Sequence, residues 1–173
     1  MKKELEEKYN NQVETAIANK DSKNVSVLGK VNNGIVNEIK LLLGIDTTNR
    51  NHIVTNDDIR HMINEHGNSI VEAKKGQIAI TIDDIKNIPN IIENYDKIVR
   101  GTNNKQGETI RYIKNANDGI SYVVEIIPKK QNMNLKIKTM WKKHVAELDT
   151  NCLKPTSDNV SNISSTSDNI VPN

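Results

Sequence analysis

The 173-residue chain has little cysteine and few aromatic residues. It contains one cysteine and no phenylalanine, and aromatic residues make up 3% of it. The single cysteine, Cys152, excludes an internal disulfide and a cysteine-rich zinc site. There is no run of about 18 apolar residues, and no apolar stretch follows the charged start MKKELEEKYNN, so we expect neither a membrane span nor a secretory signal. These absences predict a cytoplasmic protein.

Several motifs of common enzyme classes are also missing. The chain has no glycine-rich phosphate loop, no paired-carboxylate signature and no internal repeat of domain size. Their absence argues against the commonest nucleotide-dependent enzymes. His61 and His66 are five residues apart, a spacing that does not place both on one helical face for a shared metal ion. The sequence therefore predicts no metal site and no cofactor.

Positive charge is concentrated late in the chain, although the net charge is only +2. The segment 129–143 carries six lysines and no acidic residue. This density is typical of a surface that binds nucleic acid. It is equally typical of a solvated lysine face that keeps a sheet edge from aggregating.

Hydrophobic periodicity divides the chain into three parts: an N-terminal helix (1–24), one α+β domain (25–145) and a polar tail (146–173) expected to be disordered. The first helix has a narrow apolar stripe, so we expect it to pack loosely or to mediate a homo-oligomer. Pro89 is expected to kink a later helix or to split it at Asn87-Ile88. The helices and brief strands predicted in the domain, with their caps, are a strand at 25–28, a helix at 35–43 ending at Gly44, an extended segment at 52–55, a helix capped by Thr55 and ending at His66-Gly67, an alternating segment at 78–80 and a helix capped by Thr81.

After residue 96 the pattern changes to alternation with a period of two, which indicates strands. Four strands are predicted, at 97–100, 109–114, 120–127 and 133–140, and Asn117-Asp118-Gly119 is the strongest hairpin turn among them. The predicted fold is therefore α+β, with N-terminal helices packed on a four-stranded antiparallel sheet.

Few residues of the predicted core could transfer protons or bind phosphate. His66 could act as a general acid or base, or could serve only to cap its helix. Arg111, in mid-strand, could clamp a phosphate or pair with a carboxylate such as Glu125. Thr139 is either a buried hydroxyl or a phosphate donor, and Trp141 either closes the core or stacks on a base. Lys136, Lys138 and Met140 are expected on one strand face, opposite Ile137, Thr139 and Trp141.

Taken in order, the motifs resemble a known family over about residues 50–143. They are His66-Gly67, Ile80-Thr81-Ile82-Asp83-Asp84-Ile85, Ile88-Pro89-Asn90-Ile91-Ile92, Asp96-Lys97-Ile98-Val99, Ile110-Arg111-Tyr112, Tyr122-Val123-Val124-Glu125 and Lys138-Thr139-Met140-Trp141. Together they look like the phage-associated nuclease-like domains grouped with barnase, EndoU, colicins E5 and D, and RelE.

The resemblance implies a metal-independent, toxin-like endoribonuclease in which a 2′-hydroxyl attacks the adjacent phosphate and leaves a 2′,3′-cyclic phosphate. His66 would act as base or acid, Arg111 would neutralise the phosphorane, and Lys138 with Thr139 would bind phosphate. The proton partner of His66 would be Lys74, Lys75 or Tyr122. The side chains expected to hold the RNA are Lys74, Tyr112, Lys136, Trp141 and Lys142.

The implied partner is RNA, with tRNA as an expected target, in the cytoplasm of a host bacterium. A different class of function is a non-catalytic phage module that binds nucleic acid tightly and in a salt-sensitive way, or that blocks a host-defence complex. A third is a head-associated protein packaged in the virion. A phage head protein and an immunity or other host protein are the corresponding protein partners.

Overall fold

The computed structural model describes residues 2–102, 105–130 and 133–145. Its elements in chain order are α1 (Lys2–Ala18), β1 (Val25–Lys30), α2 (Asn33–Leu43), β2 (Asn51–Thr55), α3 (Asn56–His66), α4 (Ser69–Lys74), β3 (Gln77–Ile78), α5 (Ile82–Lys86), α6 (Ile88–Glu93), β4 (Lys97–Arg100), β5 (Glu108–Ala116), β6 (Gly119–Ile127) and β7 (Leu135–Lys143). None of the helices in these ranges has the length and apolar character needed to cross a membrane. The predicted disordered tail, 146–173, lies outside the described residues.

The sheet is larger than the sequence predicted. It has seven strands in the order β1-β2-β7-β6-β5-β4, with β3 paired to β7 off this path. The meander β4 to β7 is antiparallel throughout, but β2 runs parallel to β7. The expectation of a purely antiparallel sheet of four strands was therefore wrong, because the β1–β2 hairpin extends the sheet along the outer edge of β7.

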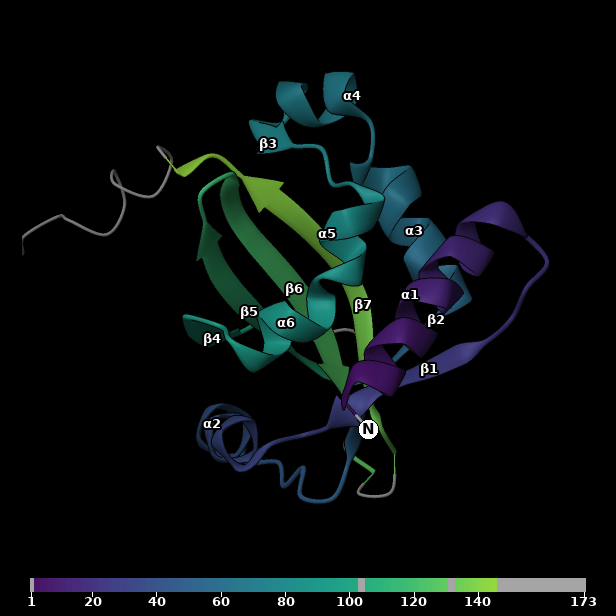
Figure 1. Cartoon of the computed structure of the whole chain (residues 1–173). Helices are drawn as coiled ribbons and strands as arrows, with labels where there is room; N and C mark the ends of the chain where they lie inside the picture. The colour runs from purple at the N-terminus through teal and green to yellow at the C-terminus, as the bar shows by residue number, and fades with distance from the viewer. Residues whose placement is uncertain (1, 103–104, 131–132, 146–173) are drawn as a thin grey trace, which may run out of the picture.

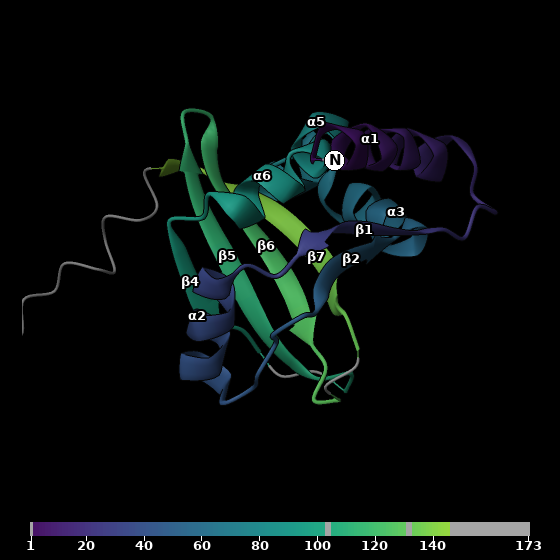
Figure 2. The ribbon, with the colours of Figure 1, turned by 60° about the horizontal axis from the view of Figure 1, so that its bottom comes forward.

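One face of the sheet is covered by helices. Figures 1 and 2 show α5 and α6 lying across β5 and β6, with α2 beside β4 and with α1 and α3 towards β7. The strand residues beneath these helices are almost fully buried: Ile98, Ile110, Tyr112, Val123, Ile127, Leu135, Ile137 and Met140. This is the single hydrophobic core of the described chain.

Helix α1 belongs to that core. Tyr9, Val13 and Ala16 are at most 1% exposed, and the Tyr9 hydroxyl donates a hydrogen bond of 2.8 Å to the carbonyl of Ile85. The expectation of a loosely packed helix was wrong, because a stripe only three side chains wide is enough when α3 and α5 close over it.

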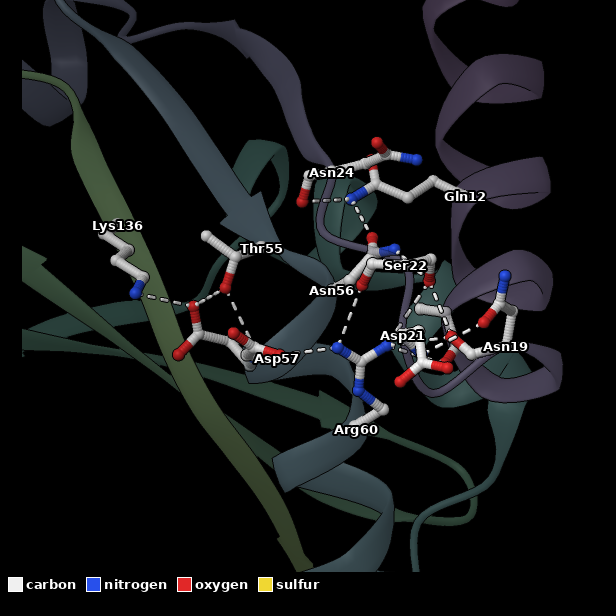
Figure 3. Close-up of polar contacts among 12 residues, drawn as sticks. Gln12, Asn19, Asp21, Ser22, Asn24, Thr55, Asn56, Asp57, Arg60 and Lys136 are labelled. Carbon is white, nitrogen blue, oxygen red and sulfur yellow. Dashed lines mark hydrogen bonds and ion pairs between the residues drawn. The ribbon is translucent and has the colours of Figure 1, made fainter.

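Polar contacts fix α1 against α3. Asn56, fully buried at the start of α3, accepts a hydrogen bond of 2.6 Å from Gln12 and donates one of 2.7 Å to the hydroxyl of Ser22. Arg60, one turn further along α3, donates to the carbonyls of Ala16 and Ser22 (Figure 3). These buried bonds fix the position of α3, and therefore the position of the histidine at its end.

The packing of α1 gives a direct prediction. Val13→Ala is expected to lower the free energy of unfolding by about 2 kcal/mol, because it leaves a cavity at a fully buried site. Urea denaturation measures this loss. Leu41→Ala removes a leucine that is 84% exposed and should change stability little. Equal, small effects of both substitutions would mean that α1 does not pack as described.

The chain signals for most helix ends are confirmed. Thr55 and Thr81 cap α3 and α5 through their side chains, and the second forms a capping box with Asp84. Pro89 splits the predicted long helix into α5 and α6, one of the two outcomes expected. Helix α4, which follows Gly67, was not predicted.

A β-bulge in β7 changes which side chains face the core. Val124 pairs with Thr139 and Glu125 pairs with Ile137, so Lys138 is an extra residue on β7. Ile137 and Met140 are both fully buried, whereas Thr139 and Trp141 are partly exposed. The expected alternation was therefore wrong from Lys138 onward. The bulge turns Thr139 and Trp141 away from the helices.

Candidate active site

The face of the sheet opposite the helices carries several of the predicted site residues. We call the open face the set of side chains that strand pairing places on this side and that are partly exposed: Arg111, Ile113, Tyr122, Val124, Thr139 and Trp141. Arg111, Val124 and Thr139 form one row across β5, β6 and β7, and Ile113, Tyr122 and Trp141 form the next.

An aromatic pair occupies the second row. The rings of Tyr122 and Trp141 are stacked, with centroids 5.2 Å apart and an interplanar angle of 7°. The Arg111 guanidinium lies 4.9 Å from the Trp141 ring centroid and 6.0 Å from that of Tyr122. A cation held against two ring faces is restricted in its orientation. The alternative in which Trp141 closes the main core is wrong, because that side chain lies on the other side of the sheet.

Two polar atoms in the first row lack partners. Arg111 Nε and Thr139 Oγ1 are buried without a hydrogen bond. Among the described residues, Arg111 forms no ion pair, and the pairing with Glu125 that we considered is excluded because Glu125 is fully buried on the helix-covered side. Buried donors without partners are uncommon in native proteins. This pair could be satisfied by an anion bound on the open face.

His66 lies at the edge of the open face. Its ring centroid is 6.4 Å from that of Trp141, and its side chain is 18% exposed. Its Nδ1 lies 3.0 Å from Oε2 of Glu72, whose other carboxylate oxygen accepts a bond of 2.6 Å from Lys75. With Nδ1 engaged, Nε2 is the nitrogen through which a proton would be exchanged. The arrangement is an oriented histidine, as found in general acid–base sites.

The Glu72 carboxylate is the centre of this cluster and is fully buried. Burial alone would raise its pKa, but the hydrogen bonds and charges of Lys75 and His66 outweigh burial, so the pKa lies below its ordinary value. Glu72 is therefore ionised at neutral pH and can accept a hydrogen bond from His66.

The lowered pKa of Glu72 predicts a pH-dependent contribution to stability. A carboxyl group with a lower pKa in the folded state stabilises the fold above its unfolded pKa, about 4.3 for glutamate, and loses that contribution as the pH falls through the folded value. The difference in free energy of unfolding between the wild type and Glu72→Gln should therefore be largest above about pH 5 and shrink in more acidic solution. Urea denaturation of both proteins from pH 3 to 7 tests this. A constant difference would contradict the ionised cluster.

The lysines of β7 share one carboxylate. Lys136 and Lys138 lie 2.9 and 3.1 Å from the two carboxylate oxygens of Asp58, which is 3% exposed at the start of α3. The Thr55 hydroxyl also donates to this carboxylate. Two ammonium groups around one carboxylate leave a net charge of +1. Lys138 is 40% exposed, so part of this charge reaches solvent.

Three predicted contact residues lie elsewhere. Tyr112 is fully buried on the helix-covered side, where its hydroxyl donates to Glu125, so it does not lie on the open face as we expected. Lys142 is 4% exposed and bridges Asp84 and Asp118, so its charge is neutralised within the fold. Lys74 is exposed on α4, the helix that also carries Glu72. The alternation of strand faces had indicated that Tyr112 lies opposite Arg111, but pointed to no ion pair for Lys142.

Sequence reasoning missed Glu72 and Asp58 as parts of the site. Glu72 lies in an unpredicted helix six residues after His66, and no motif indicated their contact. Asp58 stands three residues after Thr55, a capping-box spacing that could have shown its carboxylate folding back towards the strand. His61 is exposed, as predicted.

Comparison with known proteins gives one match. A family model described as "phage-Barnase-EndoU-ColicinE5/D-RelE like nuclease3" matches residues 29–150, more than half of the chain. No curated protein and no solved structure matches the chain.

Proposed function

This chain belongs to the phage-Barnase-EndoU-ColicinE5/D-RelE like nuclease3 family, and on that premise we propose that it is an endoribonuclease that works without a metal ion. The family supports a nuclease function in general. The proposal adds the substrate, RNA, the attack by its 2′-hydroxyl, and a toxin-like action in the cytoplasm of a host bacterium.

One observation carries the proposal: the open face brings together a proton-transfer group, a fixed cation and a pair of stacked aromatic rings. His66 and Arg111 both lie beside the Trp141 ring. RNA cleavage by internal attack needs a group that takes a proton, a positive charge at the phosphate and a surface that holds the bases. The open face supplies one candidate for each.

The proposed reaction assigns each group a step. His66 Nε2 takes the proton of the 2′-hydroxyl, and O2′ forms a bond to the adjacent phosphorus. The bond from phosphorus to O5′ breaks, and O5′ leaves with a proton. Arg111 neutralises the charge that develops on the phosphorane, with Thr139 and Lys138 beside it. Glu72 holds the imidazole in the tautomer with the hydrogen on Nδ1.

The aromatic pair favours single-stranded RNA as the substrate. Tyr122 and Trp141 present stacked rings on an exposed face, and base–aromatic stacking is worth about 1–3 kcal/mol per base. A base held there would place its sugar and phosphate near Arg111 and His66. The exposed lysine of the neighbouring α4, Lys74, could contact the next phosphate.

The proposal is tested by incubating the purified chain with total RNA, tRNA included, and with single-stranded DNA of matched length, both in EDTA. We expect the RNA to be fragmented and the DNA to remain intact, because DNA lacks the attacking 2′-hydroxyl. Salt-sensitive binding of RNA without cleavage would instead support the non-catalytic module. Cleavage of both polymers, or cleavage only with added metal ion, would contradict the proposed mechanism.

A further inference from the structure

We propose a second ligand site on the helix-covered side of the sheet, which binds a small, uncharged, planar molecule through a hydrogen bond from its N–H group to Nε2 of His52. The site is a cavity of about 560 Å³ bounded by α1, β1 and α6. It does not depend on the proposed ribonuclease function.

A buried polar network forms the base of the site. Nδ1 of His52 lies 2.8 Å from one carboxylate oxygen of Glu125, and the Tyr112 hydroxyl donates a bond of 2.7 Å to the other. All three side chains are at most 5% exposed. Burial and the Glu125 charge raise the pKa of Tyr112 well above its ordinary range, so its hydroxyl remains a donor.

This network leaves one ring nitrogen unused. Because Nδ1 faces a carboxylate, it carries the hydrogen, and Nε2 of the neutral imidazole is then an acceptor. Nε2 is buried and has no hydrogen-bond partner, and His52 lines the cavity. A buried polar atom without a partner carries an energetic cost that a ligand donor would relieve.

The walls define the rest of the ligand. Apolar surface comes from Leu5, Tyr9, Leu28, Ile35, Pro89 and Ile92. The charged side chains that line the cavity are balanced, with two lysines and two glutamates: Glu6, Lys30, Lys86 and Glu93. Pockets that hold small molecules measure about 300–1,000 Å³ and combine apolar walls with a few polar anchors. An uncharged, flat heteroaromatic molecule with one N–H donor fits this combination.

The site is separate from the open face. His52 and Glu125 point to the helix-covered side, whereas Arg111 and Thr139 point to the other. A ligand there would contact α1, β1 and α6 without touching His66 or Trp141. Binding can therefore be measured in the absence of RNA, and its failure would leave the nuclease proposal unaffected.

The test uses indole and 1-methylindole as probes of the full chain by NMR. The two molecules have nearly the same shape, but only indole has the N–H donor. We expect indole to shift the ¹⁵N resonance of His52 Nε2 and the signals of cavity residues such as Ile35 and Ile92. We expect 1-methylindole to bind about tenfold more weakly, the effect of about one hydrogen bond.

Two leucine substitutions locate the site. Leu5→Trp puts a larger side chain into the cavity from a partly exposed position and should abolish the indole shifts. Leu41→Trp makes the same change at an exposed residue of α2 and should leave them intact. The proposal is overturned if indole does not bind, if both probes bind equally without moving the His52 resonance, or if Leu5→Trp binds indole as well as the wild type does.

Discussion

Replacement of His66 by glutamine is expected to reduce the rate of RNA cleavage by about 100-fold or more, the usual contribution of a positioned general acid or base. The fold should persist, because Glu72 keeps its bond to Lys75 and His66 is not part of the apolar core. Single-turnover cleavage of a defined RNA measures the rate, and thermal melting monitors the fold.

His61→Gln is the matched control for this prediction. His61 lies on the same helix, is exposed and faces away from Trp141, so its replacement should leave the rate unchanged. If His66→Gln cleaves RNA as fast as His61→Gln does, His66 is not the proton-transfer group, and the assignment of the site is wrong.

Arg111→Gln is expected to slow cleavage by about 100-fold, the usual loss when one donor to a charged transition state is removed. Arg111→Lys should be intermediate, because an ammonium group keeps the charge but loses the planar fork that lies against Trp141. Rates measured at saturating RNA separate this effect from a change in binding.

The control for Arg111 is Arg100→Gln. Arg100 lies on the edge strand β4, is exposed and pairs with Glu108. Its loss should alter cleavage little, apart from a small salt-dependent change in RNA affinity. Equal losses for both variants would show that Arg111 contributes only general positive charge.

Local signals in the sequence predicted the elements that cap and turn the chain. Thr55, Gly67 and Thr81 mark helix ends because their backbone and side-chain atoms satisfy groups within a few residues. The hairpin at Asn117-Asp118-Gly119 is likewise formed as expected between β5 and β6. These interactions depend on neighbours in the chain, so the sequence alone defines them.

Pairing between distant segments was not predictable in the same way. The parallel contact of β2 with β7 joins residues about 80 positions apart, and His52 and Ile53 give no sequence sign of their partners. Helix α1 was misjudged for the same reason, since its narrow stripe gains its value only from α3 and α5. A strand that is short and a helix that is mostly polar carry weak patterns, which tertiary contacts override.

The site was predicted in part because strand alternation carries information on both faces. Arg111 and Tyr112 were correctly placed on opposite faces of β5, but the bulge at Lys138 changed the faces of later β7 residues. The carboxylates that organise the site were not foreseen. Glu72 reaches His66 only because an extra helix follows Gly67, and Glu125 is buried by His52 from a distant strand.

The most direct test of the proposed mechanism is the chemistry of the fragment ends. RNA cleaved by the wild-type chain in EDTA should carry 2′,3′-cyclic phosphates and 5′-hydroxyls, and these ends should decrease in parallel with the rate in His66→Gln. Mass spectrometry of a short RNA substrate identifies both ends. Fragments with 3′-hydroxyls and 5′-phosphates would contradict attack by the 2′-hydroxyl and, with it, the central proposal for the open face.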